Sequence, residues 1–373
     1  MPTTAARPFP HERALLFTLT AVQFTHILDF MIMMPLGARL MQVFGITPTQ
    51  FSLLVASYGF AAAATGFLGG FVLDRFDRRS ALLTLYTGFG IATLACALAP
   101  TYEILMAARI AAGACGGVAG SLVTSMVGDV IPPERRGRAM GMVMTAFPIA
   151  SVFGVPAGLI LSGWLEWHAP FQLLALCSAG ILFYARRVLP HVPAHRSDNH
   201  PVRQMVEILT HPIHRRCFLL SGVLVFAGAS VVPFMAPSLI TNVGLDERWE
   251  LPLVYLFGGA CAFVTMPWLG RLSDRHDKLH VLAVVSLLAV AVVPFITNLG
   301  PGPLPYTLVT TTLFFIAMSG RFAPAMAMIT NAVAARYRGG FMSVNSAVQQ
   351  ASGGLANLTA GLLITQTASG QLV

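Results

Sequence analysis

Three ionisable side chains lie well inside long apolar stretches of the sequence: Asp29, Arg109 and Arg321. A charge at the centre of a membrane helix costs at least about 2.5–3.5 kcal/mol on insertion scales, so such residues usually face a partner, a cavity or an ion pathway. Arginine keeps its proton in proteins, whereas a carboxyl group can lose and regain one. We therefore expect Asp29 to carry a coupled proton.

His26 lies one helical turn before Asp29, on the same face of the first apolar segment. An imidazole there could share or relay the proton of Asp29, but an uncharged, hydrogen-bonded core histidine explains the residue equally well. For Asp29 the alternative is a permanent ion pair with an arginine that only holds the helices together. Arg321 either binds an anionic group of a substrate or compensates Asp29 across a cavity.

The elements that position these residues are membrane helices. Hydrophobic residues make up 55% of the chain and charged residues 10%, and the apolar residues form long uninterrupted blocks. A spanning helix needs about 20 mainly apolar residues. The sequence predicts an all-α polytopic membrane protein with eleven visible spans, at residues 14–40, 51–73, 81–99, 103–130, 138–164, 168–187, 217–242, 250–271, 279–298, 305–335 and 340–366.

The basic residues indicate orientation rather than nucleic-acid binding. Of the 23 Lys and Arg, 19 lie before the first span or in the connections that follow even-numbered spans. The positive-inside rule makes these segments cytoplasmic, in a bacterial-type inner membrane with the N-terminus inside. The five cysteines have no paired spacing, and no phosphate-binding loop, metal-ligand cluster or catalytic constellation is present. We expect no metal, no cofactor other than protons, no enzymatic activity and a monomer.

The chain repeats itself. Gly70-x-x-x-Asp74-Arg75 and Gly270-x-x-x-Asp274-Arg275 are 200 residues apart, and Asp129 with Gly137 corresponds to Asn331 with Gly339 at an offset of 202. Parallel repeats of this kind place a substrate between two bundles. We expect an N-terminal bundle at 1–187, a linker with an amphipathic helix on the membrane surface at 188–215, and a C-terminal bundle at 216–373. The second repeat supplies only five spans, so a twelfth is expected to be missing.

Three motifs carry a resemblance to a known family. Gly70-x-x-x-Asp74-Arg75-x-Asp77-Arg78-Arg79 resembles the loop signature of the major facilitator superfamily, although the family usually has Gly where Asp77 stands. Leu105-x-x-x-Arg109-x-x-x-Gly113-x-x-x-Gly117 resembles the helix-4 signature. Gly154-Val-Pro156-Ala-Gly158 resembles the helix-5 signature of its drug:proton antiporter branch with twelve spans. The resemblance implies two pseudo-symmetric six-helix repeats.

The resemblance also implies roles for individual residues. The position of Arg109 is associated with proton coupling in this family. The loop signature implies a conformational latch, in which Asp74 caps the span that begins near Gly339 and Arg78 pairs with Asp129. Its members here are Gly70, Asp74, Arg75, Arg78, Asp129, Asp274 and Lys278. The alternative is a solvated loop that only sets topology.

The fifth predicted span should bend. Gly154, Pro156 and Gly158 remove a hydrogen bond and side-chain bulk, as Pro233 and Pro237 do in the seventh span. Bending of this kind also occurs in membrane helices that are not antiporters. The central cavity implied by the family would be lined by flexible apolar side chains and a few polar ones: Phe24, Phe30, Met31, Met34, Met144, Phe234, Met235, Met318, Arg321, Phe322 and Gln349.

These features favour a secondary active transporter, driven by protons, that exports small amphiphilic or drug-like solutes by alternating access. Its partners would be a small-molecule substrate and the lipid bilayer, with no nucleic acid. A second interpretation is a proton-linked or facilitated carrier of sugars or other metabolites. An interpretation of another class is a membrane sensor that transports nothing, or a nonfunctional fragment.

Overall fold

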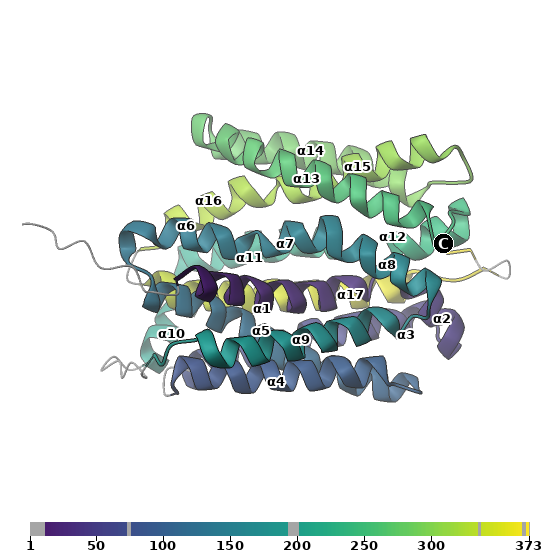
Figure 1. Cartoon of the computed structure of the whole chain (residues 1–373). Helices are drawn as coiled ribbons and strands as arrows, with labels where there is room; N and C mark the ends of the chain where they lie inside the picture. The colour runs from purple at the N-terminus through teal and green to yellow at the C-terminus, as the bar shows by residue number, and fades with distance from the viewer. Residues whose placement is uncertain (1–11, 73–75, 193–200, 335–336, 368–370, 373) are drawn as a thin grey trace, which may run out of the picture.

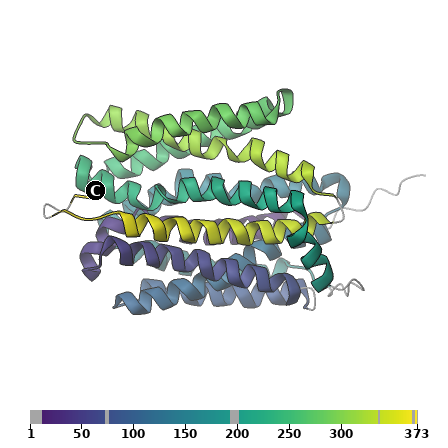
Figure 2. The ribbon, with the colours of Figure 1, turned by 180° about the vertical axis from the view of Figure 1, so that it is seen from behind.

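The computed structural model describes residues 12–72, 76–192, 201–334, 337–367 and 371–372. The helices lie side by side with nearly parallel axes in one elongated bundle (Figures 1 and 2). Within the described residues the only extended pairing is an isolated bridge between Gln366 and Leu372. In a bilayer, helices satisfy every backbone hydrogen bond internally, which is why so apolar a chain adopts them.

The N-terminal helices comprise α1 to α9. Their bounds are α1 Glu12–Ile32, α2 Gly37–Phe44, α3 Pro48–Val72, α4 Arg78–Ala97, α5 Tyr102–Val130, α6 Pro133–Met144, α7 Ala146–Ile149, the π-helical turn η2 Ala150–Gly154, α8 Val155–Trp164 and α9 Ala169–Val188.

The C-terminal helices comprise α11 to α17 and follow a linker helix, α10. Their bounds are α10 Pro201–Thr210, α11 Pro212–Ala229, α12 Val232–Ser238, the π-helical turn η3 Leu239–Val243, α13 Glu250–Arg275, α14 Lys278–Thr297, α15 Leu304–Gly320, α16 Phe322–Ala332 and α17 Arg338–Leu363. The linker helix α10 lies where the apolar spacing predicts one, and it packs against α11 and α17 with Met205 and Ile208 buried.

Ten of the eleven predicted spans correspond to segments long and apolar enough to cross a membrane. The eleventh, α17, has 26 residues, which is sufficient length, but it does not reach that apolarity. Its polar residues include Asn345, Gln349 and Asn357, and it packs between α3 and α11 inside the bundle. A helix covered by other helices needs fewer apolar side chains than one that faces lipid.

The first predicted span is shorter than expected. We predicted 14–40, whereas α1 ends at Ile32 and a turn separates it from α2. Pro35 explains the difference, because it lacks a backbone N–H and disfavours helix in the residue before it. The short helix α2 ends at Gly45 in a left-handed conformation with φ +62°, which glycine adopts without strain.

The N-terminal and C-terminal helices meet along two lines and at one end. The helix α3 packs along α17, and η2 and α8 pack against α13. At the end of the bundle that carries α2 and α12, here called the sealed end, Phe51 of α3 contacts Phe234 of α12 edge to face, with ring centroids 5.9 Å apart. A single buried apolar cluster there contains residues from both sets of helices, including Met33 and Phe314.

Candidate functional site

Asp29 and Arg109 form an ion pair within the N-terminal helices. Nη1 of Arg109 lies 2.7 Å from Oδ2 of Asp29, and both side chains are fully buried. The same nitrogen donates to the backbone oxygen of Asp29 at 3.2 Å, and the hydroxyl of Thr93 donates to Oδ1 at 3.3 Å. The carboxylate of α1 is therefore tied to both α5 and α4.

The glycines of the helix-4 motif position Arg109. A Cβ on Gly113 would lie 2.8 Å from Cα of Tyr58, and one on Gly117 would lie 2.6 Å from Cβ of Ala62. Small residues four apart thus let α5 approach the backbone of α3. This close approach places the guanidinium carbon of Arg109 4.5 Å from the centroid of the Tyr58 ring, a cation–π contact.

The ion pair leaves part of the guanidinium without partners. Nε and Nη2 of Arg109 are buried and make no hydrogen bond to any described residue. Arginine offers five N–H donors, and buried donors are normally satisfied. The pair is therefore held by charge and by the Tyr58 ring, while spare donors remain for a carboxylate rotamer, a water or a substrate oxygen.

His26 is not part of this ion pair. Both of its ring nitrogens are buried and have no hydrogen-bond partner among the described residues, as is true of Oε1 of Gln23 one turn earlier. The imidazole faces Gly120 of α5, where an added Cβ would lie 3.0 Å from Nε2. Asp29 and Arg109 are thus brought together as the sequence suggests, and His26 occupies a separate polar position.

The residues predicted to line a cavity are not gathered in one place. Met34, Phe234 and Met235 are buried in the cluster at the sealed end. Phe30 packs against the Tyr58 ring with centroids 5.3 Å apart, next to the ion pair.

Met318 belongs to the same cluster, whereas three further cavity candidates lie outside it. Met144, at the end of α6, is 45% exposed. Gln349 of α17 donates to the Ser221 hydroxyl of α11 at 2.7 Å. Arg321 lies at the junction of α15 and α16 and is buried.

The α-helical hydrogen-bond pattern of the fifth predicted span is interrupted at the predicted motif. Pro156 cannot donate a hydrogen bond to the carbonyl of Val152, and the helix accommodates this with the π-helical turn η2. A Cβ on Gly154 would lie 2.8 Å from a Leu28 methyl, and one on Gly158 would lie 2.6 Å from a methyl of Ile32. The motif therefore packs directly against the two turns of α1 that flank Asp29.

Of the predicted latch, the Arg78–Asp129 contact is present. Nε of Arg78 lies 3.3 Å from Oδ2 of Asp129. Both residues belong to the N-terminal helices, so this pair joins α4 to α5 and by itself makes no contact between the two sets of helices. Asp74 and Arg75 lie outside the described residues, and Gly70 lies near the end of α3.

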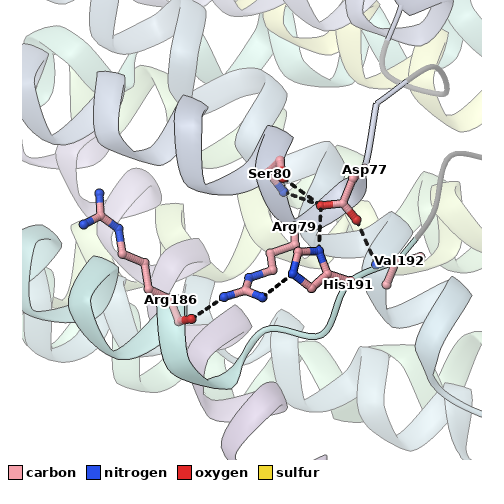
Figure 3. A network of polar contacts seen from close by, with 6 residues as sticks. All are labelled: Asp77, Arg79, Ser80, Arg186, His191 and Val192. Carbon is pink, nitrogen blue, oxygen red and sulfur yellow. Dashed lines mark hydrogen bonds and ion pairs between the residues drawn. The ribbon is translucent and has the colours of Figure 1, made fainter.

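Asp77, which replaces the glycine usual in the family, caps α4. Its Oδ2 accepts hydrogen bonds from the N–H and hydroxyl of Ser80 at 2.9 and 2.8 Å, and its Oδ1 accepts one from the Val192 N–H at 3.0 Å (Figure 3). The Arg78 N–H in turn donates to the Val192 oxygen at 3.1 Å. The start of the linker is thereby tied to the loop before α4. Asp is among the residues favoured at a helix N-cap, so its place shortly before the apolar run at 81–99 could have indicated this cap.

The charge environment of Asp77 favours its ionised form. Partial burial alone would raise the pKa of this carboxyl, but the hydrogen bonds from Ser80 and Val192 and the neighbouring His191, whose Nδ1 is 3.6 Å away, outweigh burial and lower the pKa below its ordinary value. Arg79 extends the network by contacting His191 and the carbonyl of Arg186 (Figure 3).

The second repeat reproduces the cap but not the network. Asp277 accepts from the Leu279 N–H at 2.7 Å, a hydrogen bond that lowers the pKa of the Asp277 carboxyl. Asp274 is exposed in the last turn of α13, and Lys278 begins α14. No group of three or more His, Cys, Asp or Glu within the described ranges is arranged to hold a metal ion.

The sequence matches the family model described as Major Facilitator Superfamily over residues 19–366. It is 28% identical over 308 residues to a chloramphenicol resistance protein of Streptomyces lividans, covering 79% of this chain and 77% of that protein. It is 21% identical over 258 residues to a probable sugar efflux transporter of Pasteurella multocida, covering 69% of this chain and 63% of that protein. The fold resembles the nucleoside transporter NupG, with a TM-score of 0.78, 12% identity and coverage of 96% and 94%.

Proposed function

This chain belongs to the major facilitator superfamily, so it is a multi-pass membrane transporter and not an enzyme, and we propose that it exports small amphiphilic solutes in exchange for protons. Asp29 is the proton carrier, and Arg109 is the cation that competes with the proton for it. Transport proceeds by alternating access, with the two sets of helices rocking about a central site.

The observation that carries this proposal is the fully buried Asp29–Arg109 pair with two unused arginine nitrogens. Removing one partner from a buried pair costs about 3–5 kcal/mol, because the other charge is left uncompensated. Protonation of Asp29 removes its charge and so weakens the hold of Arg109 on α1. A proton arriving from one side can therefore change how α1, α4 and α5 are tied together, which is what coupling requires.

The helix-5 motif supports a route from this pair to the other set of helices. Gly154 and Gly158 pack against α1 beside Asp29, and a Cβ on Gly259 of α13 would lie 3.1 Å from the Ser151 hydroxyl of η2. A shift of α1 on protonation would thus reach α13 through η2. The proposal assigns the π-helical turn the role of hinge.

We propose that the protein is a monomer in a bacterial-type inner membrane. The basic connections support an orientation with the N-terminus in the cytoplasm. In that orientation the sealed end faces outward. The chloramphenicol resistance protein among the relatives supports a small neutral amphiphile as one cargo.

A proton-linked carrier of sugars is the second candidate, and the sugar efflux relative is the observation that favours it. The two candidates share the coupling pair and differ in the cargo. The cavity candidates are mostly Phe and Met, which tolerate varied apolar shapes and offer few partners to sugar hydroxyls. This composition favours the amphiphile.

The proposed function is tested in proteoliposomes that contain the purified protein. An imposed pH gradient should drive chloramphenicol against its concentration gradient, and a protonophore should abolish this accumulation. Radiolabelled xylose offered in parallel distinguishes the second candidate. A protein that neither accumulates nor exchanges either solute under counterflow conditions would contradict transport by this chain and favour a sensor or a nonfunctional fragment.

A further inference from the structure

Arg321 lies where the tenth predicted span is broken. The helix α15 ends at Gly320 and α16 begins at Phe322. Pro324 accounts for the break, since it has no N–H to donate to the carbonyl of Gly320 four residues earlier. The interruption covers only Arg321, whose backbone stays helical at φ −69° and ψ −25°.

The side chain of Arg321 is only 6% exposed, yet its charge has no carboxylate beside it among the described residues. Its Nη2 lies 2.6 Å from the sulfur of Met318, and its Nε is buried without a hydrogen-bond partner there. A thioether is a weak acceptor and carries no charge. The guanidinium is therefore largely buried, and no described carboxylate lies beside it.

The sequence offers Arg321 no counter-ion nearby. The acidic residues after position 216 are Asp246, Glu247, Glu250, Asp274 and Asp277, all at helix ends, and none follows Asp277 in the chain. Asp29 is the acid buried in the first half, and Arg109 holds it at 2.7 Å. This geometry removes compensation of Asp29 as an explanation for Arg321 in this state.

We propose that Arg321 binds the carboxylate of amphiphilic organic acids, so that the transporter takes anionic as well as neutral cargo. This inference rests on the proposed function and extends it to a substrate class. A planar guanidinium matches a carboxylate in a bidentate fashion, and such charge-assisted bonds are about twice as strong as neutral ones.

The surroundings suit the apolar part of such an acid. Met318 lies one turn before Arg321 on the same face and belongs to the apolar cluster that joins the two sets of helices. The sulfur of Met318 faces Gly228 of α11, where a Cβ added to the glycine would lie 3.9 Å from it. Because Gly228 has no side chain, it leaves space beside the sulfur. A flexible thioether that now contacts the guanidinium can move aside and cover the hydrocarbon part of a ligand.

The experiment uses two ligands of equal shape that differ in charge, radiolabelled indole-3-acetate and indole-3-acetamide. Equilibrium binding to the purified full chain in nanodiscs is measured at neutral pH. The wild-type protein should bind the acid about tenfold or more tightly than the amide, as expected for a charge-assisted contact. Arg321→Gln should lower the affinity for the acid by the same factor and leave the affinity for the amide within about twofold.

Two further variants make the result specific. Arg321→Lys keeps the charge without the planar fork and should retain part of the preference for the acid. Arg271→Gln removes an exposed cation from α13 and should bind both ligands like the wild type. Equal affinity of the wild-type protein for acid and amide overturns the proposal, whether or not Arg321→Gln folds. A preference that survives in Arg321→Gln, or that is lost in Arg271→Gln, overturns it as well.

Failure of this inference is distinguishable from failure of the proposed function. Accumulation of chloramphenicol driven by a pH gradient involves a neutral solute and tests the proposed function without the acid. If the wild-type protein accumulates chloramphenicol but binds the acid no more tightly than the amide, the inference is wrong and the proposed function stands. If the wild-type protein prefers the acid in binding but accumulates no chloramphenicol, the proposed function fails.

Discussion

At the scale of single residues, the Asp29–Arg109 pair depends on an aromatic ring. The guanidinium lies over Tyr58 at 4.5 Å, and two of its nitrogens have no hydrogen-bond partner within the described part of the chain. A desolvated cation over an aromatic face is stabilised by about 2 kcal/mol or more. The ring therefore stabilises a charge that the carboxylate alone does not satisfy.

We predict that Tyr58→Leu destabilises the protein and that Tyr58→Phe does not. The Tyr58 hydroxyl is buried without a partner among the described residues, so its removal costs little, whereas removal of the ring loses a cation–π contact of about 2 kcal/mol. Thermal unfolding in detergent measures both. Equal melting temperatures for the two variants would show that the ring does not hold Arg109.

At the scale of helices, the approach of α5 to α3 positions the arginine. Gly113→Ala would place a Cβ 2.8 Å from Cα of Tyr58, and a backbone atom cannot move aside as a side chain can. We predict a loss of about 1–3 kcal/mol or more in stability, together with loss of proton-driven transport. Gly180→Ala in α9 is the matched control, because nothing lies within 4 Å of its Cβ position. It should be neutral or stabilise by up to about 1 kcal/mol. Similar effects of the two substitutions would refute the close-packing argument.

The two helix caps give a second matched pair. Asp77→Ala should cost about 0.5–2 kcal/mol for the lost cap. Asp277→Ala should also destabilise the protein, but by less, because only Asp77 serves as the acceptor of a second hydrogen bond, from Val192. Folding lowers the pKa of both carboxyl groups, so each ionised carboxylate contributes to the stability of the protein at pH values above its ordinary pKa of 3.8. That contribution to stability is lost as the pH falls through the lowered pKa of the folded protein. Melting curves at neutral pH and below about pH 4 check this, and a difference between wild type and Asp77→Ala that stays constant down to the lowest pH would be the contrary result.

The helices that the sequence predicts well are those with continuous apolar runs. The fifth span is interrupted by a π-helical turn just before Pro156, because proline acts through local chemistry that sequence reveals. The break at Gly320 was not predicted, although Pro324 could have indicated it. The helix α17 is a feature that local sequence does not explain. Its polar residues are tolerated because neighbouring helices cover it, and that burial depends on tertiary packing.

At the scale of the whole molecule, the superfamily was predictable and confirmed, whereas the site was predictable only in part. That Asp29 meets an arginine was foreseeable because the sequence offers one deeply apolar acid and few buried cations, but the sequence left Arg109 and Arg321 open as its partner. The separation of His26 from that pair was not, since three residues along a helix fix a shared face but not the direction of each side chain. The sequence also does not predict that Arg109 has a carboxylate partner and that Arg321 contacts a thioether instead, because both contacts depend on how the helices pack.

The central claim is that Asp29 carries the proton that drives export. Asp29→Asn keeps the shape of the side chain and one acceptor oxygen but cannot ionise, so it mimics the permanently protonated state. The variant should fold, bind chloramphenicol and exchange it across proteoliposomes without an energy source. It should not accumulate the solute in response to an imposed pH gradient, and its binding should lose the pH dependence of the wild type.

The most direct measurement is therefore chloramphenicol accumulation driven by an imposed pH gradient, compared with energy-independent counterflow in the same Asp29→Asn proteoliposomes. The account predicts that counterflow persists and that accumulation falls to the level of protein-free liposomes. A well-folded Asp29→Asn protein that still accumulates chloramphenicol at the wild-type level would contradict the account. Loss of folding, counterflow and accumulation together would instead identify the Asp29–Arg109 pair as a structural one.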